Sequence, residues 1–353
     1  MSAAPQYALL TDLGELAAHE GREAAAFALL RKVERRRTAQ GQDFFDLELA
    51  DVKATANAKV WGESKRAFEA IATLQTGAAV KVAFRVTRYQ GALQLVVLEL
   101  REAREGEPGF DRSRLFGRAP DWLAGRHCRV LVIDIETVPD TGIRDMPPTI
   151  VKALTEFSKR KDVDESLVRG LSPFFAKVVS LAFGEGSGDA DHAIEVLAVP
   201  RGEAEAATLP EWAHAVDEAT LLESFWSLAA AAETVVTYNG FGFDVPFLVG
   251  RSLVHGIPAR VDLLSQRFKL RPHLDLLEIL GQRGRGPSNL DVVCWALGIA
   301  SPKGEMDGSM VAPAYESGRI AEIAVYNRED VRATRAVYRR VQELLLRFRH
   351  DWS

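Results

Sequence analysis

Three short segments of this sequence carry acidic residues at spacings that suit metal binding. Asp134 and Glu136 lie two residues apart after the apolar run VLVI, and residues two apart in a β-strand point to the same face of a sheet. Tyr326 and Asp330 lie four residues apart in a segment of helical character, which places both on one helix face. Asp244 follows a second apolar run and precedes an expected helix. Ionised carboxylates brought together away from water repel one another, and a divalent cation removes that cost.

Each segment taken alone also has a plainer interpretation. An Asp-x-Glu pair can arise by chance in a chain with 49 acidic residues. Asp244 could be a helix N-cap with Pro246 in the first turn, although a capping carboxylate can also serve a metal. Tyr326 and Asp330 could lie on a solvated face of a charged helix.

Apolar strands alternate with longer helical segments in the part of the chain that contains these residues. The expected strands are 129–134, 177–184, 193–199 and 233–239, and the expected helices are 221–232 and 246–256. Strands of near-continuous apolar residues between helices predict a sheet covered on both faces. Residues from 271 onward are predicted to be largely helical. The predicted fold class is therefore α/β, with a ribonuclease-H-like mixed sheet flanked by helices.

The first hundred residues have a different periodicity, that of short half-buried strands. The expected strands are 25–37, 44–51, 55–62, 78–89 and 92–100, with a helix over 63–75 and a tight turn at Gln90-Gly91. Five strands with a helix between the third and fourth predict a small OB-like β-barrel, a fold whose open face commonly takes single-stranded nucleic acid.

Residues 20–103 resemble the nucleic-acid-binding OB domains attached to some tRNA synthetases and exoribonucleases. The resemblance rests on the run ERRRTAQGQDFFDLELAD and on the later segments AKVW and TGAAVKVAFRVTRYQGALQLVV. The second hairpin departs from that pattern, because Asp51-Val52-Lys53 stands where an Asp followed by a Gly turn is expected.

Basic and aromatic residues of this first part are candidates for contact with nucleic acid. Arg35, Arg36 and Arg37 could contact a phosphate backbone, although such a run is usually a solvated face. A second candidate is the loop 283–285. Four aromatic residues could stack on bases, and the sequence does not separate them from core residues: Phe44, Trp61, Phe84 and Tyr89.

The three acidic segments together resemble the three exonuclease motifs of the DnaQ-like, or DEDD, superfamily. These motifs correspond here to Asp134-Ile135-Glu136, to Asn239 through Phe243-Asp244, and to Tyr326 through Asp330. Tyr326 indicates the tyrosine (DEDDy) branch, because the other branch has His where this chain has Val325. Residues 128–345 resemble the proofreading 3′–5′ exonuclease domain of family B DNA polymerases in its stand-alone bacterial form. The segments LSPFFAKVVSLAFG, HLDLLEIL and KGEMDGSMV add to that resemblance.

The resemblance implies a two-metal hydrolysis of phosphodiesters that releases 5′-mononucleotides from a 3′ end. One ion would be held by Asp134, Glu136 and Asp330, and a second would bridge Asp134 and, directly or through water, Asp244. Tyr326 would orient the attacking water. The all-oxygen ligand set implies Mg²⁺ or Mn²⁺.

Further residues near these motifs are candidates for contact with the substrate strand. Asn239 and Phe243 could contact the terminal nucleotide, although Phe243 could equally be a core residue. Lys303 could meet a phosphate or could be a solvated loop residue.

The predicted organisation is an OB-like nucleic-acid-binding domain over 1–105, a linker over 106–125 and an exonuclease domain over 126–353. The linker region is rich in Gly, Pro and Arg, and Phe110, Phe116 and Trp122 could pack it. The favoured substrate is single-stranded DNA. The alternatives are an exoribonuclease and a non-catalytic nucleic-acid-binding protein, and the complete set of acidic positions argues against the latter. A DNA repair role follows from the family alone, and no repair or replication partner can be named.

Composition limits the remaining possibilities. A length of 353 residues suits two domains, and a net charge of −5 is not that of a protein that passively coats DNA. Two cysteines outside any C-x-x-C pair predict neither a zinc site nor a disulfide framework. We expect a soluble cytoplasmic protein, since neither a secretory signal nor a run of eighteen apolar residues is visible.

Overall fold

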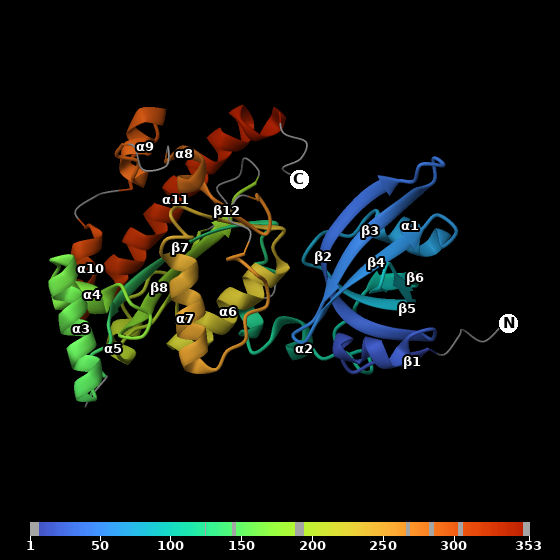
Figure 1. Ribbon diagram of the computed structural model, residues 1–353, viewed down its shortest axis with the longest axis horizontal. Helices are drawn as coiled ribbons and strands as arrows, with labels where there is room; N and C mark the ends of the chain where they lie inside the picture. Colours follow the sequence, from blue (N-terminus) through green and yellow to red (C-terminus); the bar gives the residue numbers. More distant parts are fainter. Residues whose placement is uncertain are drawn as a thin grey trace. The chain divides into compact units, whose positions relative to one another are not determined.

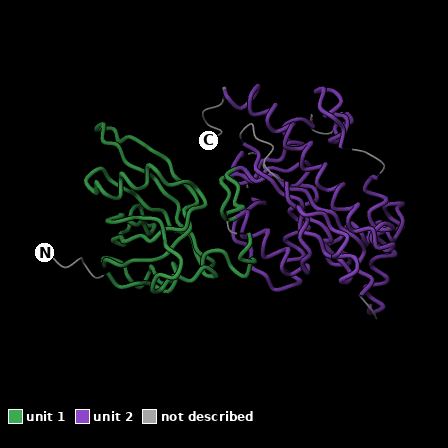
Figure 2. The backbone as a smooth tube through the Cα atoms, turned by 180° about the vertical axis from the view of Figure 1, so that it is seen from behind, with its two compact units in different colours: residues 1–129, 230–233 green, residues 130–229, 234–353 purple. Residues whose placement is uncertain are grey.

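The computed structural model describes residues 7–123, 125–142, 146–187, 194–265, 269–281, 286–302 and 306–348. Figure 1 shows the elements in chain order, and Figure 2 shows two compact units. Unit 1 comprises residues 1–129 and 230–233, and unit 2 comprises residues 130–229 and 234–353. Unit 1 thus takes in the residues of the expected linker.

Unit 1 is built on a closed five-stranded barrel. Its strands are β2 (Glu23–Arg37), β3 (Asp43–Ala50), β4 (Thr55–Trp61), β5 (Ala79–Tyr89) and β6 (Ala92–Glu102). Strand β2 pairs with both β3 and β5, and the parallel pairing of β4 with β6 completes the closure. Helix α1 (Lys65–Ile71) lies between β4 and β5 in sequence. The predicted OB-like barrel is confirmed.

Period-two alternation explains why these segments form the barrel. Val80, Val82 and Val86 of β5 are fully buried in one apolar core, together with the alternate residues of β3. The expected tight turn follows β5, where Gln90 and Gly91 both have positive φ (48° and 84°). Positive φ at both central residues is typical of the two-residue turns that match the twist of hairpin strands.

Two features of unit 1 were not predicted. A short strand β1 (Ala8–Leu9) pairs with β2, and a 3₁₀ helix, η1 (Leu13–His19), adds two leucines to the core. The Asp51 carboxylate accepts backbone N–H groups from Lys53 (2.7 Å), Ala54 (2.8 Å) and Leu13 (2.5 Å). The carboxylate therefore stabilises the second hairpin where the OB pattern has a glycine turn, and it also fixes the start of η1.

The residues after β6 form short helical turns. They are α2 (Ser113–Phe116) and η2 (Asp121–Leu123). Phe110 meets the Phe27 ring edge-on with centroids 5.2 Å apart, and Phe116 is buried. The half-buried Trp122 ring lies 5.3 Å below the Arg126 guanidinium. The expected aromatic packing of this region is therefore present within unit 1.

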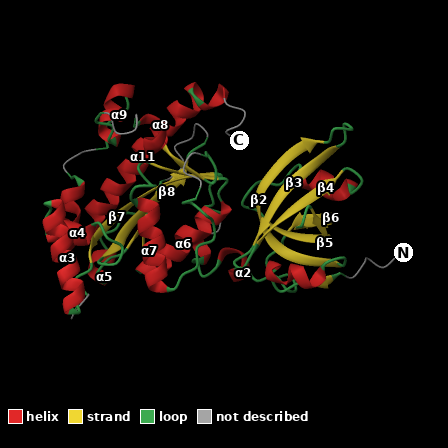
Figure 3. Cartoon of the chain, in the orientation of Figure 1, coloured by secondary structure: helices red, strands yellow, loops and turns green. Residues whose placement is uncertain are grey.

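Unit 2 is a mixed six-stranded sheet with helices packed against it, as the strands in Figure 3 show. The strand order is β10 (Ala213–Ala215), β9 (Glu195–Ala198), β8 (Ala176–Glu185), β7 (Val130–Pro139), β11 (Thr234–Thr237) and β12 (His273–Asp275). Strand β8 is antiparallel to β7 and β9, whereas β11 is parallel to β7 and β12. The predicted ribonuclease-H-like α/β fold is confirmed.

The helices of unit 2 cover the sheet with apolar side chains. Helices α6 (Glu218–Ala231) and α7 (Asp244–His255) lie where they are predicted. The later helices are α8 (Leu276–Leu280), α9 (Leu290–Leu297), α10 (Val311–Glu316) and α11 (Ile320–Leu344). Helix α11 packs on β7, β8 and β9.

Several short elements differ from the sequence prediction. Residues 273–275, expected within a helical region, form strand β12, because three residues are too few to show a strand period. Helices α3 (Pro148–Lys161), α4 (Glu165–Gly170) and the short α5 (Glu203–Ala206), together with strand β10, were not predicted. None of the helices in the described ranges has the length and apolar character to cross a lipid bilayer. Cys128 and Cys294 are both buried, and neither forms a disulfide.

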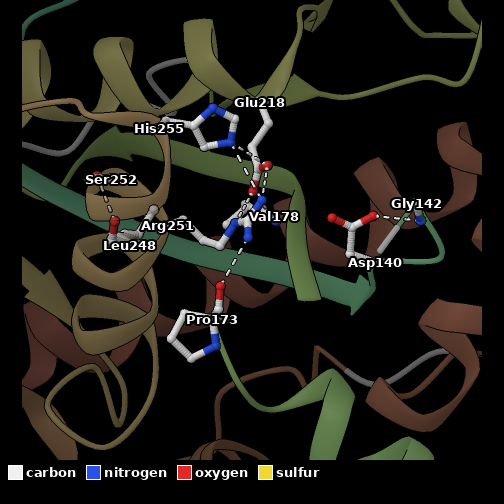
Figure 4. A network of polar contacts seen from close by, with 9 residues as sticks. All are labelled: Asp140, Gly142, Pro173, Val178, Glu218, Leu248, Arg251, Ser252 and His255. Atoms are coloured by element: carbon white, nitrogen blue, oxygen red, sulfur yellow. Dashed lines mark hydrogen bonds and ion pairs between the residues drawn. The ribbon is translucent and has the colours of Figure 1, made fainter. Parts of the chain in front are cut away.

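A buried ionic network joins α6, α7 and the start of β8, and Figure 4 shows it. Both carboxylate oxygens of Glu218 accept from Arg251, at 2.8 Å and 2.7 Å, and Oε1 also accepts the Val178 N–H (2.8 Å). His255 Nε2 lies 2.9 Å from Glu218 Oε2, and Arg251 donates to the Pro173 carbonyl (3.0 Å). We call Glu218, Arg251 and His255 the ionic clamp.

Candidate active site

Three carboxylates from two elements converge in unit 2. Val130 and Val132 of β7 share an apolar cluster with Val331 of α11, so this face of the strand is turned toward the helix. Asp134 and Glu136 continue the same face of β7. One oxygen from each of these two residues and one from Asp330 of α11 lie within 4.8 Å of one another. We call these three residues the carboxylate cluster.

The carboxylate cluster is electrostatically unfavourable when ionised. Burial raises the pKa of Asp134 well above its usual value, and the charges of Asp244, Asp330 and Glu136 raise it further. Burial, Asp330 and Asp244 act in the same direction on the pKa of Glu136. A divalent cation would supply the missing positive charge, and an all-oxygen donor set suits a hard cation. The residues present therefore fit a divalent metal ion.

Asp244 lies beside the carboxylate cluster without belonging to the close group of three. It is the first residue of α7, whose N-cap position is taken by Phe243. The Asp244 side chain is buried, and its Oδ1 accepts the N–H of Ile135 at 3.3 Å. Burial raises the pKa of Asp244 to about 7. The side chain therefore points to β7 between Asp134 and Glu136, and the N-cap interpretation does not hold.

Tyr326 lies one helical turn before Asp330 on α11, and both face the carboxylate cluster. Asp330 is the acid that acts most strongly on the Tyr326 phenol. Burial, followed by the charges of Asp330, Glu136 and Asp134, raises the pKa of the phenol far above its usual value. The phenol consequently stays protonated and has one proton to donate.

The loop that carries Asp244 is held by a residue outside the three motifs. Asp275, at the end of β12, accepts the N–H of Asn239 (2.8 Å) and that of Phe241 (2.9 Å), and it also caps α8. Asn239 has a left-handed backbone (φ 69°). A Cβ at Gly240 would collide with Thr237 Oγ1, so the tight turn requires glycine there.

The aromatic and polar side chains of this loop occupy different environments. Asn239 is exposed. Phe241 packs on the buried His273 ring with centroids 4.2 Å apart. Phe243 is half-buried and lies 5.4 Å from the buried Phe247 ring. Asn239 and Phe243 therefore remain accessible, whereas Phe247 is a core residue.

Comparison with known proteins identifies the relatives of this fold. Residues 175–351 match the family described as "Predicted 3'-5' exonuclease related to the exonuclease domain of PolB". The chain belongs to this family. The resemblance to family B proofreading domains is thereby confirmed, and exonuclease domains of this kind use divalent metal ions.

Single relatives of this chain match over limited ranges. A DNA polymerase of Pyrococcus glycovorans is 28% identical over 117 residues, which make up 29% of this chain and 15% of the polymerase. The family B DNA polymerase of Pyrobaculum calidifontis is 15% identical with a TM-score of 0.43, over 89% of this chain and 46% of that one. The single-stranded DNA-binding protein Rim1 of S. cerevisiae is 16% identical with a TM-score of 0.22, over 25% of this chain and all of Rim1. The chain spans less than half of either polymerase.

Two buried polar residues near the carboxylate cluster escaped the sequence reasoning. Asn327 donates from Nδ2 to Asp134 Oδ2 (2.6 Å), and its Oδ1 accepts from Ser180 Oγ of β8 (2.8 Å). Asn327 and Ser180 are both fully buried. In the sequence, Ser180 is marked only as a polar residue within the apolar run KVVSLAFG, and Asn327 only as the residue that follows Tyr326. This chain of hydrogen bonds fixes the orientation of the Asp134 carboxylate.

The basic candidates of unit 1 are engaged with neighbouring acids. Arg35 and Arg37 both pair with Asp43 (2.6 Å and 3.1 Å), and Arg36 pairs with Glu34 (2.6 Å). All three side chains are more than half exposed, at 62% for Arg35, 51% for Arg36 and 71% for Arg37. Lys303 and the loop 283–285 lie outside the described residues.

The aromatic candidates of unit 1 differ in burial: Phe84 and Phe44 are buried, Trp61 is half-buried and Tyr89 is 57% exposed. Phe84 is fully buried in the barrel core. Phe44, Trp61 and Tyr89 surround the Lys59 amino group at 5.2, 5.8 and 5.4 Å from their ring centroids. Lys59 and Trp61 alternate along β4 with the core residues Ala58 and Val60, so they point outward. We call Phe44, Lys59, Trp61 and Tyr89 the aromatic platform.

Proposed function

We propose that this protein is a metal-dependent 3′–5′ exonuclease that releases 5′-mononucleotides from the 3′ end of single-stranded nucleic acid, with DNA preferred to RNA. One observation carries the proposal: Asp134, Glu136, Asp330 and Tyr326 converge beside Asp244 in a chain of this exonuclease family. Catalysis would rest on these five side chains.

The carboxylates would hold two Mg²⁺ or Mn²⁺ ions. Asp134, Glu136 and Asp330 would bind one ion, and Asp134 with Asp244 would bind the second. Such ions stabilise the negative charge that develops on the phosphoryl oxygens during in-line displacement. No His side chain belongs to the close carboxylate group within the described residues, which favours these hard cations over zinc.

The remaining residues of the site would position these groups and the substrate. Asn327 would keep one Asp134 oxygen directed toward the carboxylate cluster, since its amide is itself held by Ser180. The protonated Tyr326 hydroxyl would donate a hydrogen bond to the water that attacks phosphorus. Asn239 and Phe243, which are accessible next to Asp244, would contact the terminal nucleotide.

Capture of the strand is assigned to unit 1. Exposed rings combined with a cation suit single strands, because every base has a face that can stack and every linkage carries a phosphate. The aromatic platform supplies both, with the exposed Tyr89 and the half-buried Trp61 as rings and Lys59 as the cation. Arg35, Arg36 and Arg37 could add phosphate contacts by exchanging their carboxylate partners for phosphates, and Lys303 remains a further candidate for a phosphate contact.

A single assay tests the catalytic proposal. Matched 5′-labelled DNA and RNA oligonucleotides are incubated with Mn²⁺ or Mg²⁺ or with EDTA, and the products are separated by length. We expect ladders that shorten from the 3′ end, with 5′-mononucleotides released, faster on DNA, and none with EDTA. Asp134→Asn should abolish the ladder, and Asp162→Asn, at the exposed C-cap of α3, is the matched control. Strand binding without any metal-dependent release would favour the non-catalytic alternative, and faster digestion of RNA would favour the exoribonuclease.

Strand capture has its own test. Loss of one stacking ring costs about 1–3 kcal/mol per base, so Trp61→Ala should weaken binding of a labelled single strand by about tenfold. Trp295, which is 82% exposed in unit 2, supplies the matched control Trp295→Ala. Equal affinities of the two variants for the single strand would show that the aromatic platform does not bind it.

A further inference from the structure

Helices α3 and α4 form an apolar groove that the catalytic proposal does not use. Both helices lie between β7 and β8 in sequence, and they pack against each other (Figure 1). The groove encloses a cavity of about 590 Å³. Its lining is apolar except for Lys161 and Ser172, and includes Leu154, Phe157, Leu167 and Leu171.

Large apolar side chains around this groove are exposed to an unusual degree. Four of them line the groove: Ile150 (38%), Phe157 (41%), Leu167 (52%) and Leu171 (55%). Val151 (41%) and Phe174 (59%), in the same segment of the chain, are also exposed. Single exposed apolar residues are common on soluble proteins, but a contiguous set around a cavity marks an interaction site.

The floor of the groove is held firmly to the sheet. The Gly170 carbonyl accepts from Thr137 Oγ1 (3.2 Å), and the Phe175 carbonyl accepts from the Asp140 N–H (2.9 Å). Arg251 of the ionic clamp donates to the Pro173 carbonyl (Figure 4). Thr137 directly follows Glu136 on β7. The groove is therefore preformed, and it is connected through the backbone to a strand of the carboxylate cluster.

The charges along the rim favour an anionic partner. Lys161 lines the groove, and Lys159 lies near it at the end of α3. Neither lysine forms an ion pair with a carboxylate of the described residues. No acid is among the described residues that line the groove. Of the nearby acids, Asp164 caps α4 through the Ser166 N–H (2.7 Å), Glu165 accepts from Thr155 Oγ1 (3.3 Å), Glu156 pairs with Lys152 (3.7 Å), and Asp162 is the exposed C-cap of α3.

We propose that this groove binds a short segment of a partner protein whose bulky apolar side chains are flanked by acidic residues. The apolar residues would fill the cavity and cover the exposed leucines, and the acids would meet Lys159 and Lys161. Apolar anchors inserted into a groove between helices are a recurrent mode of peptide recognition. Binding of a single strand is less well served, because the lining is mainly aliphatic and leaves few polar groups for phosphates.

The test measures peptide binding by fluorescence anisotropy with the full chain. The probe is a labelled peptide of about twelve residues with Leu and Phe at helical i, i+3, i+4, i+7 spacing and Glu elsewhere. The matched peptide keeps the apolar residues and replaces Glu by Lys. We expect saturable micromolar binding of the acidic peptide, and binding of the basic peptide weaker by about tenfold or more.

Paired variants connect binding to the groove. Leu171→Asp and Lys161→Glu should each weaken binding of the acidic peptide by about tenfold. Two control variants should leave the affinity for the acidic peptide unchanged. They are Leu253→Asp, at a 71% exposed position on α7, and Lys152→Glu, at a position outside the groove lining. Cleavage of a short single strand by all four variants should stay at the wild-type level.

Three results would overturn the proposal. The first is equal binding of acidic and basic peptides. The second is loss of oligonucleotide affinity, rather than peptide affinity, in Leu171→Asp and Lys161→Glu. The third is a self-associated wild type that Leu171→Asp converts to monomer without any peptide binding.

Discussion

Two buried groups of charges in unit 2 show opposite ways of keeping carboxylates away from water. In the ionic clamp, Glu218 is surrounded by Arg251, His255 and a backbone N–H (Figure 4). In the carboxylate cluster, Asp134 receives one amide hydrogen bond from Asn327 and otherwise faces acids. Basic partners from the neighbouring helix α7 surround Glu218, whereas the charges that act on Asp134 and Glu136 within the described ranges are those of other acids. A structural acid is therefore stabilised by basic side chains, whereas the acids of the candidate site repel one another until a cation binds.

The largest expected effect is on turnover and comes from the carboxylate cluster. Asp330→Asn should reduce exonuclease activity by about 10³-fold or more, because metal binding supplies several kcal/mol of transition-state stabilisation. The same change should raise the metal-free stability by about 1 kcal/mol, since it removes one repelling charge. Activity assays and urea unfolding in EDTA measure the two effects, with Asp162→Asn as the control. A loss of both activity and metal-free stability would contradict the comparison.

Breaking the ionic clamp should have the opposite sign on stability. Arg251→Met leaves a buried Glu218 without its main partner and should cost about 3–5 kcal/mol of unfolding free energy. The double variant Arg251→Met with Glu218→Leu should recover much of that loss, because apolar replacements of buried ion pairs are often tolerated. Urea unfolding measures both. Equal stability of the single and double variants would show that the clamp does not hold a buried charge.

Asn327 should act on metal affinity more than on folding. Asn327→Leu keeps the approximate size but removes the amide that orients Asp134, and such supporting residues typically contribute 10–100-fold. Mn²⁺ titration, followed by calorimetry as well as by activity, should show a dissociation constant raised by about that factor. Ser180→Ala should show a smaller shift in the same direction. An unchanged metal affinity in Asn327→Leu would exclude a positioning role.

The most gradual expected effect is on the pH dependence of metal-free stability, since it extends over several pH units. The pKa of Asp244 is raised to about 7 in the folded chain, so between about pH 4 and 7 the folded state binds a proton that the unfolded state does not. Stability should therefore fall as pH rises through this window. Unfolding midpoints in EDTA between about pH 4 and 8 measure the slope. Asp244→Asn should make the slope shallower without removing it, because the pKa values of Asp134 and Glu136 are raised in the same direction. An unchanged slope in Asp244→Asn would contradict the prediction.

Much of the architecture could be predicted because it follows from local periodicity. The alternation of Val80, Val82 and Val86 indicated a barrel strand, and the same period placed Asp134 and Glu136 on one face of β7. Helical spacing placed Tyr326 and Asp330 together on α11. Elements without a clear period escaped, such as β12, which has three residues, and the short β1.

The residues that complete the site depend on contacts between distant segments. Asn327 and Ser180 are 147 residues apart in sequence, and Asp275 holds a loop that begins 36 residues earlier. The hydrophobic periodicity of the separate segments does not indicate either contact. The assignment of Phe84 to the core and of Trp61 to the surface likewise required the barrel to close.

The amino-acid sequence alone specified which residue types share a face, because side-chain direction within a strand or helix is set by backbone geometry. The tertiary structure decided which faces meet: that β7 and α11 bring three carboxylates within 4.8 Å, and that Asp244 turns toward β7 rather than capping α7. These decisions rest on packing between segments up to 193 residues apart. Such packing depends on the burial of all their neighbours at once and cannot be read from any one segment.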